Sequence, residues 1–170
     1  MSELSVEEAV GSSMQVQTAS QIHLLGEDQF SGDEYGYLDS PLWVGSDGAP
    51  RYSMERWFRL VFTMPFTDIR RVHLWLPQTM PPGWLLRLGT SLTYFTPTTA
   101  SSTIAATPAP MTRTSEPNVA LADNGVVERR TEWIVLQAVV DGDAPSGPPL
   151  GYGLDGQPNP LEYHVEWSEL

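Results

Sequence analysis

The chain has 170 residues, enough for one domain with a hydrophobic core, and 41% of them are hydrophobic. It contains no cysteine and no lysine, which excludes disulfides, Cys-ligated zinc and Schiff-base catalysis. The net charge of -12 makes the surface repel nucleic acids and anionic membranes at long range.

Charged residues make up only 18% of the chain, whereas glycine (14) and proline (15) are plentiful. Long surface helices need more Glu, Lys and Arg on their solvent-facing sides. The composition therefore favours short strands joined by loops. No apolar run approaches the roughly 18 residues needed to cross a membrane.

The first strand is expected within residues 14–24, where apolar and polar residues alternate. Residues 1–13 are small and acidic and hold no basic residue, unlike a secretory signal; they are predicted to form an N-terminal arm with a brief helical turn at 6–10. Residues 26–50 are expected to form a loop. Its aromatic residues indicate that it packs against another part of the protein, and a short strand is expected at 42–44.

The clearest strand spans residues 56–64, and Pro65 ends its ladder because it has no N–H to donate. A second strand follows at 71–76, joined to the first by a hairpin or by a crossover between two sheets. In these strands the inward positions are Phe58, Leu60, Phe62, Met64, Val72, Leu74 and Leu76, and the outward ones Trp57, Arg59, Val61, Thr63, Arg71, His73 and Trp75.

Residues 84–95 are expected to form a strand pair or a bent strand, with a bulge or turn at Gly89. Residues 96–117 are rich in Thr, Ser, Ala and Pro and lack periodicity. A loop of this length is uncommon inside a compact domain, so we expect it to be mobile or to lie against a neighbouring molecule.

Residues 132–140 are apolar on both faces, which predicts a central strand covered on both sides. Residues 141–160 form another Gly/Pro-rich excursion, and the closing strand at 161–167 points Leu161, Tyr163, Val165 and Trp167 inward. The pattern predicts an all-β protein: an antiparallel β-sandwich, jelly-roll or immunoglobulin-like, formed by residues 14–170 with long Gly/Pro/Thr-rich loops.

Motifs for chemistry are weak. Asp-Gly pairs could bind calcium, but they are also common turn dipeptides and lack EF-hand spacing. His23, His73 and His164 lie on separate predicted strands, and three scattered surface histidines are the simpler interpretation. We therefore predict no enzyme, and no catalytic, cofactor-binding or metal-binding residue. A cupin-like metalloenzyme would need the three histidines to converge.

Tryptophan and arginine gather on the outward faces, and these two residue types are enriched at interface hot spots. Three alternatives stay open for these tryptophans: burial by the chain's own loops, a subunit interface, or a sugar-stacking platform. The residues predicted to make contacts are Trp57, Arg59, Arg71 and Trp75, with Thr96, Pro97, Thr98, Pro108 and Pro110 from the long loop.

Three segments carry a resemblance: Trp133-Ile134-Val135-Leu136-Gln137-Ala138, Gly147-Pro148-Pro149-Leu150-Gly151-Tyr152 and Leu161-Glu162-Tyr163-His164-Val165-Glu166-Trp167. From about residue 56 onward the pattern resembles structural proteins of tailed bacteriophages.

The resemblance implies a capsid decoration (cement) protein, or a tail component, that stabilises an assembled particle. The implied partners are further copies of the chain, in a homo-oligomer such as a trimer, and other virion proteins such as the major capsid protein. Neither nucleic acid, membrane nor cofactor is expected, and the implied location is the virion, assembled in the host cytoplasm. The alternative is a carbohydrate-binding module or an adhesin domain of a phage tail or fibre.

Overall fold

The computed structural model describes residues 2–18, 48–77, 80–98, 101–102, 104, 107–145 and 163–169. Within those ranges the chain is all-β, every strand pair is antiparallel, and no helix could cross a membrane. The predicted fold class is confirmed. The strands are β1 (Glu3–Val10), β2 (Gln15–Thr18), β3 (Arg51–Tyr52), β4 (Arg56–Thr63), β5 (Ile69–Trp75), β6 (Trp84–Ser91), β7 (Thr107–Pro108), β8 (Glu128–Arg130), β9 (Trp133–Val140) and β10 (His164–Glu169).

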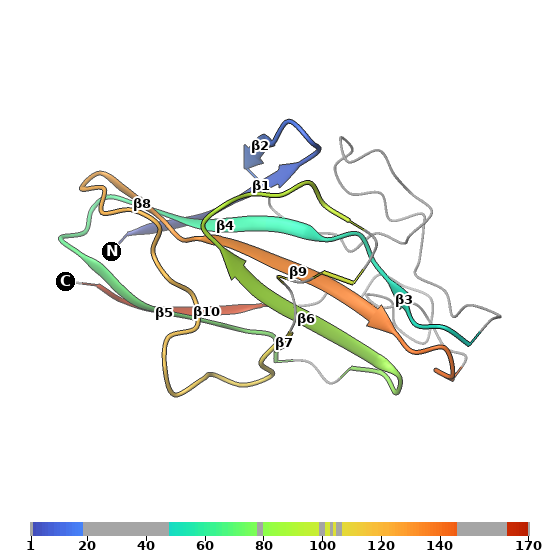
Figure 1. The fold of residues 1–170 in the computed structure, drawn as a ribbon. Helices are drawn as coiled ribbons and strands as arrows, with labels where there is room; N and C mark the ends of the chain where they lie inside the picture. The colour runs from blue at the N-terminus through green and yellow to red at the C-terminus, as the bar shows by residue number, and fades with distance from the viewer. Residues whose placement is uncertain are drawn as a thin grey trace.

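The strands form two sheets that pack face to face (Figure 1). The larger sheet has the order β2-β1-β4-β9-β6-β7, with β3 added to β9 and β8 to β4; the smaller sheet pairs β10 with β5. Because β4 and β5 are consecutive yet belong to different sheets, their connection is a crossover and not a hairpin. The two ends of the described chain meet where the Ser2 amide donates to Glu169 Oε2 over 3.1 Å.

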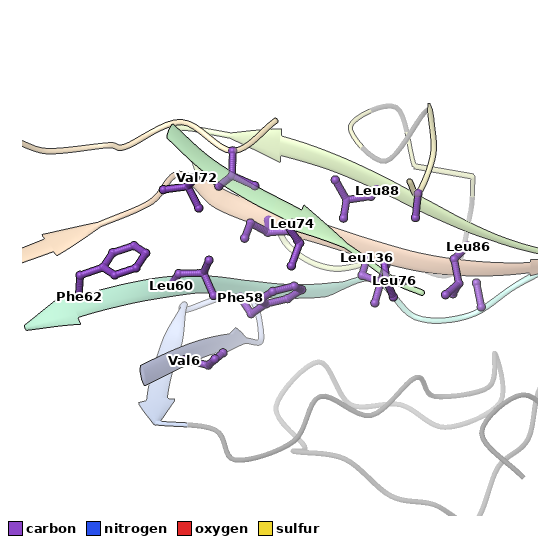
Figure 2. Packing of buried hydrophobic residues seen from close by; sticks show 14 of the residues in the cluster. Val6, Phe58, Leu60, Phe62, Val72, Leu74, Leu76, Leu86, Leu88 and Leu136 are labelled. Carbon is purple, nitrogen blue, oxygen red and sulfur yellow. The ribbon is translucent and has the colours of Figure 1, made fainter. Parts of the chain in front are cut away.

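The main core fills the space between the sheets (Figure 2). Alternate residues of each strand point into it, as the period-two pattern predicts. Met64 is an exception: it was expected to face inward, but it lies beyond the end of β4 and is exposed. Core residues from the strands include Val6, Phe58, Leu60, Phe62, Ile69, Val72, Leu74, Leu86, Leu88, Ile134, Leu136, Ala138 and Val140.

β9 is the central strand of the larger sheet. All eight of its residues are buried, because β4 and β6 flank it and both of its faces are covered. The continuous apolar run therefore corresponds to a doubly covered strand, as predicted.

The N-terminal residues correct one prediction. Residues 3–10, expected to lie in an arm, form β1 between β2 and β4. Leu4 and Val6 sit opposite Phe62 and Leu60 and pack with the core, so the segment alternates like the other strands. The acidic residues concealed this, since Glu8 occupies an inward position that an apolar residue would normally fill.

Glu8 is buried because Arg56, at the start of β4, forms an ion pair with it. Both side chains are almost entirely removed from solvent. Burial raises the pKa of Glu8, and the nearby Arg56 charge opposes part of that rise. This ion pair lies at one end of the core, and each of its two buried charges is stabilised by the other.

The remaining predicted strands differ from the observed ones mainly in their bounds. β2 covers residues 15–18 of the expected 14–24 strand, and residues 19–24, like the strand expected at 42–44, lie outside the described residues. β6 ends at Ser91, and Gly89 pairs in register with Val135, without the expected bulge. In β10, Val165 and Trp167 pack toward the core, as predicted.

Candidate contact surfaces

The outer face of the larger sheet holds a second, aromatic cluster. Trp57 of β4 and Trp133 of β9 lie on this face, and the Tyr94 ring packs against both, with centroid distances of 5.2 and 5.8 Å. The Trp57 indole N–H donates to Glu55 Oε2 over 3.1 Å. Because Trp57 is only 1% exposed, its own chain buries it, and the intramolecular alternative holds for this residue.

Arg59 lies next to this cluster on the same face. Its guanidinium is 4.5 Å from the centroid of the Trp133 ring, which is a cation–π geometry. Its Nε donates to Glu7 Oε2 over 2.8 Å, and Arg130 lies near the same carboxylate. Arg59 is therefore held by two neighbours of its own sheet, Trp133 and Glu7, although part of its side chain remains open to solvent.

The first part of the long loop packs over this outer face of its own chain, whereas the sequence predicted a mobile loop or one that lies against a neighbour. The Thr98 carbonyl accepts the Glu55 amide over 3.0 Å. The Ser102 amide donates to the Gln137 Oε1 atom over 3.2 Å. Of the predicted contact residues here, Thr96 is exposed, whereas Pro97 and Thr98 are partly buried.

The later part of the loop also joins its own chain. Pro108 lies in β7, which pairs with β6 and is exposed, while the Pro110 carbonyl accepts the Leu76 amide over 2.8 Å. Asn118 then bonds both backbone groups of Leu74 through its amide, each over 2.8 Å. The loop thus runs from the larger sheet to the smaller one and fastens to both.

Trp75 and Arg71 belong to the smaller sheet. The Trp75 ring is partly exposed and lies 5.4 Å from the ring of His164, its cross-strand partner. Arg71 is exposed and has a positive φ of 55°. Because Trp57 and Arg59 lie on the other sheet, the structure does not bring the four predicted contact residues together.

His73 faces outward on β5 as expected, but it is buried and not at the surface. Its Nδ1 lies 3.4 Å from Thr114 Oγ1, and its Nε2 is 3.4 Å from an Arg113 nitrogen. Arg113 also donates to Glu166 over 2.9 Å, and this bond lowers the pKa of the Glu166 carboxyl. His164 is exposed, and His23 lies outside the described residues; no metal-binding cluster exists among the residues described.

Two groups of exposed apolar side chains lie at opposite ends of β1, and sequence reasoning missed both. The hairpin patch consists of Met14, Val16 and Phe95, which are 44%, 41% and 53% exposed. Val16 shares a cross-strand row with Ala9 and Trp57, and the Phe95 ring lies 6.0 Å from that of Trp57. These contacts place Val16 and Phe95 on the outer face, and Met14 lies in the turn that leads into β2.

The turn patch consists of Met64, Val126 and Val127, which are 51%, 79% and 64% exposed. The Met64 amide donates to the Val127 carbonyl over 3.1 Å, which holds the two turns side by side. Along β1, Ala9 pairs near the hairpin patch and Glu3 pairs beside Met64. At a rise of roughly 3.3 Å per residue, the two patches are about 20 Å apart.

Comparison with known proteins adds no relative: no protein-family model, no curated protein and no solved structure matches this chain.

Proposed function

We propose that this protein is a structural component of a virus particle, a capsid decoration or cement protein that acts through contacts and not through chemistry. Its partners in this proposal are further copies of the chain and other virion proteins such as the major capsid protein. The resemblance of its strand pattern to structural proteins of tailed bacteriophages supports the proposal.

The observation that carries the proposal is the pair of exposed apolar patches. Exposed apolar side chains that cluster are a recognised mark of protein interaction sites, whereas single ones are ordinary. A cement protein needs at least two contact surfaces to bridge neighbouring subunits. The hairpin patch and the turn patch would provide two such surfaces, because they lie at opposite ends of β1.

The proposal is tested by locating the chain in purified particles. Particles from a culture that produces the protein are separated on a density gradient, and the chain is quantified against the major capsid protein. We expect the two to co-sediment in a fixed ratio. A chain found only in the free fractions, with none in the particles, would contradict the proposal.

The patches are tested with double variants of the purified chain. Val126→Ser with Val127→Ser, and separately Val16→Thr with Phe95→Ser, should each abolish binding to particles stripped of the protein. These side chains are exposed, so folding should be nearly unchanged, with stability within about 0.5 kcal/mol. Leu85→Ser, also at an exposed apolar position but on β6, is the matched control and should bind normally.

One observation favours a glycan-binding function as the second candidate. The Trp75 ring is partly open on the outer face of the smaller sheet and lies beside the exposed His164. An aromatic ring on a β-face can stack against a sugar ring. Binding on a glycan array that is lost in Trp75→Ala would favour this function, and the absence of any glycan signal would remove it.

A further inference from the structure

An open cleft of about 460 Å³ lies where the start of β5 meets the segment that leads into β8. One wall is formed by residues 68–72 and the other by Pro117, Val119, Ala120 and Leu121, with Asn124 and Arg129 at the side. The Val119 amide donates to the Val72 carbonyl over 3.3 Å, which joins the two walls. The volume lies within the range of ordinary ligand pockets, roughly 300–1,000 Å³.

The charge of this cleft is opposite to that of the whole protein. Three of the nine arginines, Arg70, Arg71 and Arg129, line it together with a single acid, Asp68. Asp68 is already shared, since it pairs with both Arg70 and Arg129, and the hydrogen bond from Arg70 lowers the pKa of its carboxyl. Three positive charges against one negative charge leave a local excess of two, in a chain whose net charge is -12.

Arg129 gives the cleft a fixed positive floor. Its Nη1 donates to the Ile69 carbonyl over 3.1 Å and its Nε donates to the Gly125 carbonyl over 3.2 Å. These bonds immobilise the guanidinium, and the side chain is largely buried. A ligand that binds here therefore meets a charge whose position is already set.

A bulge in β5 supplies the exposed arginines of the site. β10 pairs Glu166 with His73 and Ser168 with Arg70, so two residues of β5, Arg71 and Val72, stand opposite one residue of β10. Consecutive strand residues normally point to opposite faces, but the positive φ of Arg71 leaves both Arg70 and Arg71 exposed. Two neighbouring guanidinium groups thus line the same cleft.

We infer that this cleft binds an acidic peptide segment of a partner protein, with a carboxylate held by Arg70 and Arg71 and an adjacent apolar side chain against Ala120 and Leu121. Arginine binds carboxylates through paired N–H groups, and such charge-assisted bonds are strong. The apolar wall favours a peptide over a nucleic acid, because a peptide can place an apolar side chain beside its carboxylate. The inference goes beyond the proposed function, because particle binding through the two patches does not require it.

The test uses fluorescence anisotropy with the full chain and a labelled peptide that carries glutamates on both sides of one leucine. We expect saturable binding that weakens with added salt. Arg71→Asn should weaken it by about tenfold or more, the effect expected for removing one arginine from a paired contact. Asparagine tolerates a positive φ, so this variant keeps the backbone; Arg70→Gln is a second variant on the other guanidinium.

Arg113→Gln is the matched control, because it removes one positive charge from an exposed arginine outside the cleft. It should leave peptide binding within about twofold of the wild type, since an exposed charge outside the cleft makes no direct contact with the peptide and is screened by salt. Equal weakening by Arg71→Asn and Arg113→Gln would overturn the inference, as would no binding to the wild type. Competition by inorganic phosphate or by an oligonucleotide of equal charge, at the concentration of a competing unlabelled peptide, would show a general anion site and also overturn it.

Discussion

The two faces of the larger sheet are buried in different ways. On the inner face, side chains at alternate positions of β4, β6 and β9 interdigitate with those of β5, and the cluster is apolar throughout. On the outer face, a small aromatic cluster around Trp57 and Trp133 is covered by the first part of the long loop, which has no periodicity. Glu55, Gln137 and Arg87 form hydrogen bonds with that part of the loop. Burial on the inner face follows from a pattern repeated along strands, whereas on the outer face it depends on individual polar bonds.

This difference predicts that the largest losses of stability come from truncations on the inner face. Phe62 is fully buried there and its ring lies 5.2 Å from that of Trp167. Phe62→Ala should lower the free energy of unfolding by about 3–5 kcal/mol, because the cavity it leaves between the sheets cannot close. Urea unfolding measures this; a loss below about 1 kcal/mol would show that the sheets do not pack as described.

The buried Glu8–Arg56 pair at the end of the same face should give the next largest effect. Arg56→Met leaves the Glu8 carboxylate buried without its cation, at an expected cost of about 3 kcal/mol at neutral pH. Burial raises the pKa of Glu8, so the stability linked to its protonated form is present at acid pH and is lost as the pH rises through that pKa. Without Arg56 the pKa rises further, and the deficit should therefore shrink on mild acidification.

The control for the ion pair is Glu8→Leu combined with Arg56→Met, which replaces both charges by apolar groups. Such replacements are often neutral or stabilising, so this double variant should recover most of the loss. Unfolding curves for the single and double variants at neutral and mildly acid pH measure both effects. A deficit in Arg56→Met that is independent of pH would contradict the role assigned to Glu8.

On the outer face, Trp57→Phe keeps an aromatic ring but removes the indole N–H that Glu55 accepts. Glu55 is buried, so we expect a loss of about 1–3 kcal/mol, the usual cost of leaving a buried polar group without its partner. Glu55→Gln in the same background removes the charge and should restore part of the stability. If Trp57→Phe is neutral, the polar bond does not contribute to burial on this face.

Tyr94→Phe should have a smaller effect on stability, because it removes one hydrogen bond that attaches the covering segment. The Tyr94 hydroxyl donates to the Gly11 carbonyl over 2.7 Å, which ties the segment to the β1–β2 hairpin. Its loss should cost about 1 kcal/mol. Thermal unfolding detects such a change, and faster proteolysis between residues 92 and 104 should accompany it.

The smallest effect is expected on the smaller sheet, for Arg113→Gln. Arg113 and Glu166 form an exposed ion pair, and pairs of this kind are screened by solvent and salt. We expect no resolvable change in the unfolding curve at physiological salt. A clear destabilisation would indicate that Arg113 supports the buried His73 more strongly than the 3.4 Å separation implies.

The sequence was sufficient to predict most of the inner face, apart from β1, and not the outer one. The alternation in β4, β5 and β10 and the apolar run of β9 indicated the sandwich, because one buried face imposes period two. β1 was missed since Glu8 is buried only through Arg56, a residue 48 positions away that local periodicity does not reveal.

The burial of Trp57 by its own chain was unpredictable for a similar reason. Trp57 occupies an outward position. It is removed from solvent only because Tyr94 and the segment that follows Tyr94 pack against it. That docking depends on Gln137, a polar residue inside an apolar run, whose amide bonds both Ser102 and the Ser53 carbonyl. Such long-range polar bonds leave no periodic signal in the sequence.

In the proposed function, the hairpin patch and the turn patch are the contact surfaces of a folded sandwich. Hydrogen–deuterium exchange, measured on the free chain and on the chain bound in particles, tests this claim. We predict slower exchange on binding at residues 14–18 and 126–127, with the Glu55 and Ser102 amides already protected in the free chain. Protection gained only at residues 96–104, starting from fast exchange in the free chain, would contradict it.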